Sequence, residues 1–248
     1  MSAPPADLQF MIKICGVKCA QTALLAAKNG ANLVGLVFAD ASPRAISPAA
    51  AKNIVSNLKQ NADREGFEVP GIVGLVVDPS DELLSQIAGF VDWIQLHGSE
   101  SPDRVRAIKT RFGKRVIKAI GVENSEDIHR ASSFAGYADL VLLDARPPKG
   151  DRQTGGHGRA FDWALLEKNA VLPPFLLAGG LKPENVAAAI AAGSGHTGFA
   201  GVDVSSGVER SRGEKDDDLL CLFVQRAWAA YEAERRGRQQ ERQKHGRD

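Results

Sequence analysis

Residues 10–16 read Phe-Met-Ile-Lys-Ile-Cys-Gly, an apolar run that ends in a cysteine and a glycine. Short runs of this kind are typical of buried strands. The glycine predicts that the chain turns directly after the strand. A side chain at such a strand end can reach a ligand while the scaffold stays rigid. Cys15 is therefore a candidate functional residue.

Seven more runs of the same character follow along the chain. Together with the first, they predict strands over residues 10–15, 33–38, 72–77, 91–96, 115–120, 140–144, 175–179 and 201–205. Segments rich in alanine, leucine and charge lie between them and predict helices over 19–29, 48–60, 80–89, 100–112, 124–134, 162–168 and 183–192, with a last helix from about 215. Prolines after Ser47, Ser101 and Lys182 mark three helix starts. This alternation indicates a parallel sheet covered by helices.

The strand count favours an eight-stranded parallel (β/α)8 barrel of the TIM type over an open, doubly wound sheet. Polar residues inside the strands support closure, because they fall on one parity while their neighbours on the other parity are apolar. The polar set is Lys13, Cys15, Gln95, His97, Asp203 and Ser205. In a closed barrel the apolar set faces the helices. The polar set then lines the interior and the carboxyl-terminal mouth, where such barrels have their active sites.

Composition narrows the class of protein. A chain of 248 residues, 44% of them hydrophobic, is of ordinary size for one barrel domain. We expect this domain to have a short N-terminal extension over residues 1–9 and a charged, fraying tail over residues 231–248. Lys and Arg number 31 against 30 Asp and Glu, so neither nucleic acid nor a membrane is expected as partner. No apolar run approaches the ~18 residues of a membrane span, and the sequence predicts a cytoplasmic protein.

The cysteines also agree with a cytoplasmic protein. Cys15, Cys19 and Cys221 are odd in number and scattered, which suits a reducing compartment. No ligands near Cys15 and Cys19 complete a four-ligand zinc site, so no metal is expected.

Two irregular segments have different predicted roles. Residues 145–160 form the longest stretch without a periodic pattern, and they follow the sixth predicted strand. Long loops at this end of a compact barrel are usually functional, so we expect a mobile lid over the mouth. Residues 60–70 lie at the other end of the barrel, where they are predicted to be a linker.

Glycines follow the last two predicted strands. Gly179 and Gly180 come after the seventh, and Ser205, Ser206 and Gly207 come after the eighth. Barrels often bind phosphate at these two loops, because glycines let backbone N–H groups approach an anion. A single pair of glycines would indicate only a tight turn. Two such loops in the correct order predict a phosphate site.

Seven short stretches, in one order between residues 11 and about 226, lie at predicted strand ends. They are Lys13-Ile14-Cys15-Gly16; Gly35-Leu36-Val37-Phe38 with Ser42-Pro43-Arg44; Gln95-Leu96-His97-Gly98; Leu143-Asp144; Gly155-Gly156 with Phe161-Asp162-Trp163; Ala178-Gly179-Gly180-Leu181 with Pro183-Glu184-Asn185-Val186; and Gly201-Val202-Asp203-Val204-Ser205-Ser206-Gly207-Val208-Glu209. In this combination the chain resembles the phosphoribosylanthranilate isomerase family of tryptophan biosynthesis. The resemblance implies an α/β barrel without cofactor or metal, whose partner is a small phosphosugar substrate.

The resemblance also implies roles for individual residues. Asp144 is expected to be the general acid and Cys15 the general base of an Amadori rearrangement. Arg44 is expected to bind the anthranilate carboxylate, and His97 to bind or position substrate. Gly179, Gly180, Ser205 and Ser206 are expected to bind the phosphate.

Lys13 and Asp203 are predicted to support Cys15. Both have inward parity on strands that become neighbours when the barrel closes, so we expect an ion pair between them. Lys13 lies two residues before Cys15 and is expected to lower the pKa of that thiol.

Two other functions stay open at the level of sequence. A histidine-pathway isomerase performs the same rearrangement with two aspartates, whereas Cys15 stands at the base position here. A non-catalytic phosphosugar-binding barrel would have lost its acid or base, and both are present. The sequence is compatible with a monomer or a homodimer.

Overall fold

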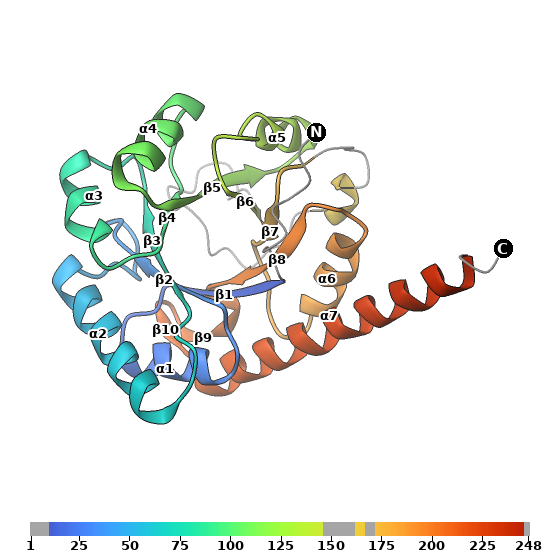
Figure 1. Cartoon of the computed structure of the whole chain (residues 1–248), viewed down its shortest axis with the longest axis horizontal. Coiled ribbons are helices and arrows are strands. Elements are labelled where there is room, and N and C mark those ends of the chain that lie inside the picture. The colour runs from blue at the N-terminus through green and yellow to red at the C-terminus, as the bar shows by residue number, and fades with distance from the viewer. Residues whose placement is uncertain (1–9, 146–161, 167–171, 246–248) are drawn as a thin grey trace.

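The computed structural model describes residues 10–145, 162–166 and 172–245 (Figure 1). Its main sheet consists of β1 (Met11–Cys15), β2 (Leu33–Val37), β3 (Gly71–Val76), β4 (Trp93–Leu96), β5 (Arg115–Val122), β6 (Leu140–Ala145), β7 (Phe175–Leu177) and β8 (Phe199–Val204). The strands pair in chain order, all parallel, and β8 closes onto β1. The predicted (β/α)8 barrel is confirmed.

Helices surround this barrel (Figure 1). They are α1 (Ala20–Lys28), α2 (Pro48–Glu65), α3 (Asp81–Ala88), α4 (Pro102–Phe112), α5 (Ser125–Ser132), α6 (Val186–Ser194) and α7 (Asp217–His245), with short 3₁₀ turns η1 (Trp163–Leu165) and η2 (Ser206–Val208). The helices α2 and α4 begin at Pro48 and Pro102, at two of the prolines that predicted helix starts. Ser47 and Ser101 cap them, since each hydroxyl accepts a hydrogen bond from a backbone N–H of the first turn. The predicted start of α6 is wrong: the helix begins at Val186, after Pro183.

Other element bounds differ from the prediction as well. The helix α2 continues through residues 60–65, so only 66–70 connect it to β3. Its extra turn is stabilised because Ala62 is buried, and it ends at Gly66, which has a left-handed backbone. The described part of the predicted helix 162–168 is the turn η1. The lid over 146–160 and the extension over 1–9 lie outside the described residues.

An antiparallel hairpin that the sequence did not predict follows β8. It consists of β9 (Glu209–Ser211) and β10 (Glu214–Lys215) and lies between η2 and α7. The last helix consequently begins at Asp217. The hairpin contributes side chains to the barrel mouth, as described below.

Side-chain parity follows the prediction with one exception. Apolar residues such as Ile12, Ile14 and Val202 pack between the strands and the helices, and a second cluster around Trp93 fills the barrel interior. The exception is Lys118 on β5, which pairs in register with Leu96 and so lies on the helix-facing side. Its side chain is buried there against Phe134, at 5.9 Å from the ring centroid.

The helix α7 extends well beyond the barrel (Figure 1). Its first half is anchored by aromatic contacts: the ring of Tyr231 stacks on Phe10 at 4.1 Å between centroids, and Trp228 Nε1 donates a hydrogen bond to Gly30 O at 3.0 Å. Fraying of the tail over 231–248 stays a prediction. Within the described ranges, no helix combines the length and apolar composition that crossing a membrane requires.

Truncation separates the anchored part of α7 from the rest. Removing residues 232–248 keeps Tyr231 and Trp228, so we expect turnover to stay unchanged and the melting temperature to move little. Removing residues 228–248 deletes both aromatic contacts and uncovers Phe10, which costs about 2–4 kcal/mol of unfolding free energy. Thermal unfolding measures both. Loss of activity after removal of residues 232–248 would contradict the conclusion that Trp228 and Tyr231 anchor the helix.

Candidate active site

A cavity of about 60 Å³ lies at the carboxyl ends of the barrel strands. It is lined by Cys15, Val37, Ala39, Ser42, Arg44, Leu75, Gln95, His97, Asp144, Asp203 and Ser205. The structure thus brings the predicted acid, base and arginine to one place, although they come from β6, β1 and the loop after β2. Lys13, Gly179, Gly180 and Ser206 are outside this lining.

The predicted ion pair between Lys13 and Asp203 is present. Lys13 Nζ donates to Asp203 Oδ1 at 2.6 Å, and the lysine is fully buried. The two residues are partners in the register of β1 with β8, so barrel closure alone brings them together. Burial opposes the charge of Lys13, but Asp203 and the neighbouring Cys15 outweigh it and raise the pKa of the lysine.

Lys13 lowers the pKa of Cys15 as expected, but the net shift of the thiol pKa is upward. Cys15 is 5% exposed, and burial raises the pKa of its thiol more than the charges of Lys13 and Lys215 lower it. Asp203 adds to the rise. Burial is the largest of these effects, so the two lysine charges do not bring the pKa of the thiol below its ordinary value.

Arg44 forms a two-pronged ion pair with Glu209 of β9. Its Nε donates to Oε1 at 2.7 Å and its Nη2 donates to Oε2 at 2.9 Å. Nη1 has no protein partner among the described residues. The side chain of Arg44 packs against Gly16, where a Cβ would overlap it. Nη1 is therefore available to donate to a further acceptor.

Glu209 is the centre of a buried charge cluster with Arg44 and Lys215. Besides Arg44 it accepts hydrogen bonds from Lys215 Nζ and Gly213 N, each at 2.9 Å. Burial alone would raise the pKa of Glu209, but the contacts with Arg44 and Lys215 outweigh it and lower the pKa to about 2. Sequence reasoning named Glu209 only as part of a matching stretch and missed Lys215, because both depend on the unpredicted hairpin.

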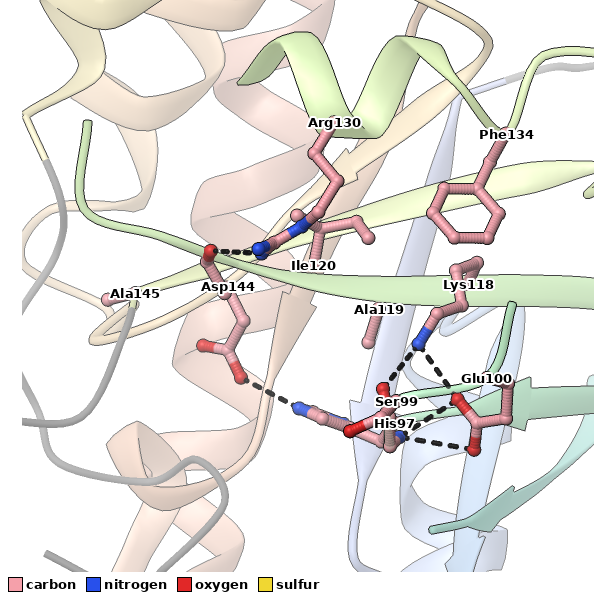
Figure 2. Close-up of a pocket in the computed structure, with 12 residues that line it drawn as sticks. His97, Ser99, Glu100, Lys118, Ala119, Ile120, Arg130, Phe134, Asp144 and Ala145 are labelled. Carbon is pink, nitrogen blue, oxygen red and sulfur yellow. Dashed lines mark hydrogen bonds and ion pairs between the residues drawn. The ribbon is translucent and has the colours of Figure 1, made fainter. Parts of the chain in front are cut away.

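Asp144 faces His97 across the cavity. His97 Nε2 lies 3.5 Å from Asp144 Oδ2, and Figure 2 shows the ring pointing at the carboxylate. On the other side of the ring, Gln95 Nε2 lies 3.2 Å from His97 Nδ1. As the amide is placed, it donates to Nδ1 and leaves the ring hydrogen on Nε2, toward Asp144. This arrangement suits His97 to hold the carboxyl group in place.

A larger cavity of about 390 Å³ adjoins the first and shares His97 and Asp144 with it (Figure 2). Lys118 and Glu100 form a buried ion pair of 2.8 Å in its wall. Lys118 also donates to Gly98 O at 2.7 Å, and Glu100 accepts from the N–H groups of Asp78 and Gly98. The pair therefore fixes the loop that directly follows His97. The only sign of this ion pair in the sequence is that Lys118 lies on an otherwise apolar strand face.

The two glycine loops lie against each other. Gly179 and Gly180 have left-handed backbones with φ of 77° and 65°. A Cβ on Gly207 would overlap the carbonyl oxygen of Leu181, so the loops after β7 and β8 are in direct contact. Ser205 Oγ donates to Cys15 O at 3.1 Å, which commits its hydroxyl hydrogen to the protein. The geometry leaves backbone N–H groups as the donors for an anion at this point.

Among the residues that the structure describes, no three His, Cys, Asp or Glu side chains gather as metal ligands. The groups that line the mouth are a thiol, a carboxyl group and an imidazole beside fixed positive charges, and such groups are suited to acid–base chemistry.

A sequence model of N-(5'phosphoribosyl)anthranilate (PRA) isomerase matches residues 12–226. The chain belongs to this family. The N-(5'-phosphoribosyl)anthranilate isomerase of Rhodopseudomonas palustris strain BisB5 is 42% identical over 227 residues, which cover 91% of this chain and 99% of the relative. The crystal structure of phosphoribosyl anthranilate isomerase from Thermotoga maritima is 34% identical with a TM-score of 0.75, and the match covers 89% of this chain and all of that one.

Another similar structure of the family contains a ligand. It is phosphoribosyl anthranilate isomerase in complex with reduced 1-(o-carboxyphenylamino)-1-deoxyribulose 5-phosphate, at 33% identity and a TM-score of 0.72. The match covers 89% of this chain and 100% of that chain. Family membership makes this chain an isomerase, as the sequence predicted.

The raised pKa of Cys15 can be measured directly. In a Cys19→Ser, Cys221→Ser background, the ultraviolet absorbance of the thiolate should titrate with a midpoint above 9.0, the ordinary value for a thiol. Burial is the physical reason, since it disfavours the charged form. The matched control is a chain that keeps only Cys19, which is exposed. A Cys15 midpoint below that of Cys19 would contradict the assignment.

Glu209 is expected to stabilise the folded state in a pH-dependent way. Its folded pKa of about 2 lies below the ordinary 4.5, so its contribution is complete above pH 4.5 and is lost as pH falls toward 2. The contribution is about 3 kcal/mol. Glu209→Gln should therefore unfold more easily at pH 7, and the gap to wild type should narrow on acidification.

Urea unfolding across this pH range tests the charge cluster. Glu214→Gln is the control, because Glu214 lies on the same hairpin but is exposed, with the partly exposed Lys18 as its partner. This substitution should cost less than about 1 kcal/mol. A gap between wild type and Glu209→Gln that is constant with pH would refute the role of the carboxylate charge.

Proposed function

We propose that Cys15 and Asp144 perform the two proton transfers of the isomerase reaction, with Cys15 as general base and Asp144 as general acid. The reaction itself follows from family membership: the chain isomerises N-(5'-phosphoribosyl)anthranilate in tryptophan biosynthesis. The observation that supports the two roles is that both side chains line one small cavity at the barrel mouth.

Asp144 would act first. The furanose ring opens when the ring oxygen takes a proton from the carboxyl group while the amine nitrogen pushes its electron pair toward C1′, which breaks the bond from C1′ to the ring oxygen. The product of this step is an iminium ion and a free hydroxyl. Asp144 is 8% exposed, so few waters compete for its proton.

Cys15 would act second. The iminium ion makes the hydrogen on C2′ acidic, and the thiolate removes it as a proton, which leaves an enol-amine. The enol-amine takes a proton at C1′ and loses the one on its C2′ hydroxyl to become the ketose. A thiol with a raised pKa is a stronger base once it is ionised, which favours this step.

The remaining predicted site residues would bind the substrate. Gly179, Gly180 and Ser206 would hold the phosphate through backbone N–H groups, in the two loops that touch each other. Ser205 would join them through its backbone, since its hydroxyl hydrogen is donated to Cys15 O. Arg44 would bind the anthranilate carboxylate through Nη1 while Glu209 holds the other two nitrogens.

Two further expectations belong with this proposal. Lys13 and Asp203 would support Cys15 by fixing the end of β1 against β8. The phosphosugar is the expected partner, and a cytoplasmic location and a monomeric or homodimeric state stay predictions.

Turnover of N-(5'-phosphoribosyl)anthranilate tests the proposal. Cys15→Ser and Asp144→Asn should each lower kcat/KM by about 10²- to 10⁴-fold, because each removes one proton-transfer group. Cys19→Ser is the matched control: it also removes a thiol, but an exposed one outside the cavity, and should keep wild-type turnover.

The outcomes separate the levels of the proposal. Inactivity of the wild-type chain on this substrate would defeat the function itself. Full activity in Cys15→Ser or Asp144→Asn would defeat only the role given to that residue.

A further inference from the structure

We propose that Lys215, on the hairpin after β8, is a positioning residue of this reaction. It holds Ser205 against the backbone of Cys15 and supplies a positive charge that, together with Lys13, favours the Cys15 thiolate. The inference rests on the proposed role of Cys15 as general base, and goes beyond it by naming a group that helps the Cys15 thiol to ionise.

The contacts of Lys215 lead directly to Cys15. Lys215 Nζ donates to Ser205 O at 2.9 Å and approaches Ser205 Oγ at 3.4 Å. Ser205 Oγ in turn donates to Cys15 O at 3.1 Å. The lysine is 7% exposed, so these contacts are shielded from water. The end of β1, which carries Cys15, is thereby tied to the hairpin through one hydroxyl group.

The charges around Cys15 do not cancel. Lys13 and Asp203 form a one-to-one pair and contribute little net charge. On the other side, Glu209 is a single carboxylate shared between two cations, Arg44 and Lys215. This three-residue cluster has a net charge of +1.

The remaining titratable groups near Cys15 also contribute to its electrostatic environment. His97 and Asp144 also line the cavity, with 3.5 Å between His97 Nε2 and Asp144 Oδ2. Asp203 is the remaining carboxylate at Cys15, and it raises the pKa of the thiol, whereas Lys13 and Lys215 lower it against the larger effect of burial. Lys13, which is bound to Asp203, has the larger lowering effect, and Lys215 adds a second positive charge from the net positive cluster on the hairpin side.

A purely structural role does not account for this lysine. Glu209 is already held by both prongs of Arg44 and by Gly213 N, so it has partners without Lys215. Burying a second cation beside Arg44 costs free energy, and burial lowers the pKa of Lys215 despite Glu209. An apolar side chain of similar length would fill the space at less cost. A buried charge kept at such a cost points to a functional use.

The test compares Lys215→Met with the wild type in the Cys19→Ser, Cys221→Ser background. In the free protein, the thiolate titration midpoint of Cys15 should rise by about one pH unit, which is a tenfold smaller thiolate fraction below the midpoint. The kcat at neutral pH should fall about tenfold, with a smaller change in KM. The lost activity should return as pH approaches the new midpoint, which damage to the fold would not produce.

Two further variants complete the design. Lys215→Arg keeps the charge and should retain the wild-type midpoint. Lys18→Met is the control, because Lys18 is paired with Glu214 of the same hairpin at 3.0 Å but is partly exposed, and it should leave both the midpoint and kcat unchanged. If Lys215→Met does not fold, Lys215→Gln, which can still donate to Ser205 O, replaces it with the same expected shift.

An unchanged midpoint in the neutral variants would overturn the proposal, as would an equal shift in Lys215→Arg and Lys215→Met. The titration needs no substrate. Its result is therefore separate from the proposed function, which fails instead if Cys15→Ser keeps full activity.

Discussion

Every charge buried in this barrel has to find a partner of opposite sign, and the architecture of the active site depends on that constraint. Lys13 in the barrel interior pairs with Asp203, Lys118 behind the sheet pairs with Glu100, and Arg44 at the mouth pairs with Glu209. An unpaired charge at any of these depths would cost several kcal/mol. Each pair therefore holds together two segments that are distant in the sequence.

The first two of these pairs position the groups proposed to react and take no part in the reaction themselves. The pair of Lys13 and Asp203 fixes the strand end that carries Cys15, and the pair of Lys118 and Glu100 fixes the loop after His97. Polar groups with fixed partners do not reorganise when charge develops on a substrate, and this is a main source of electrostatic catalysis. The barrel mouth is thus rigid on the sides of β1, β4 and β8.

The sequence predicts the barrel and most of the site because both follow from local patterns. Strand parity identifies the inward positions of Lys13, Cys15 and Asp203, and closure of eight strands makes the lysine and the aspartate neighbours. What the sequence does not predict is the outcome of competing long-range effects. The net pKa shift of Cys15 depends on burial against two lysines, one of which, Lys215, is 200 residues away. The hairpin that carries Lys215 has strands too short to produce a periodic pattern.

Gly179 limits the movement of the Asp144 carboxyl group. A Cβ at this position would lie 2.7 Å from Asp144 Oδ1 and would also collide with the backbone of Ala145. One carboxyl oxygen of Asp144 is thus packed against bare backbone, while the other faces His97. Glycine at the end of β7 therefore does two things: it leaves room for the Asp144 carboxyl group, and its backbone limits the rotation of that group on the Oδ1 side. Position 179 thus constrains the orientation of the residue proposed as proton donor, although glycine has no side chain with which to take part in the chemistry.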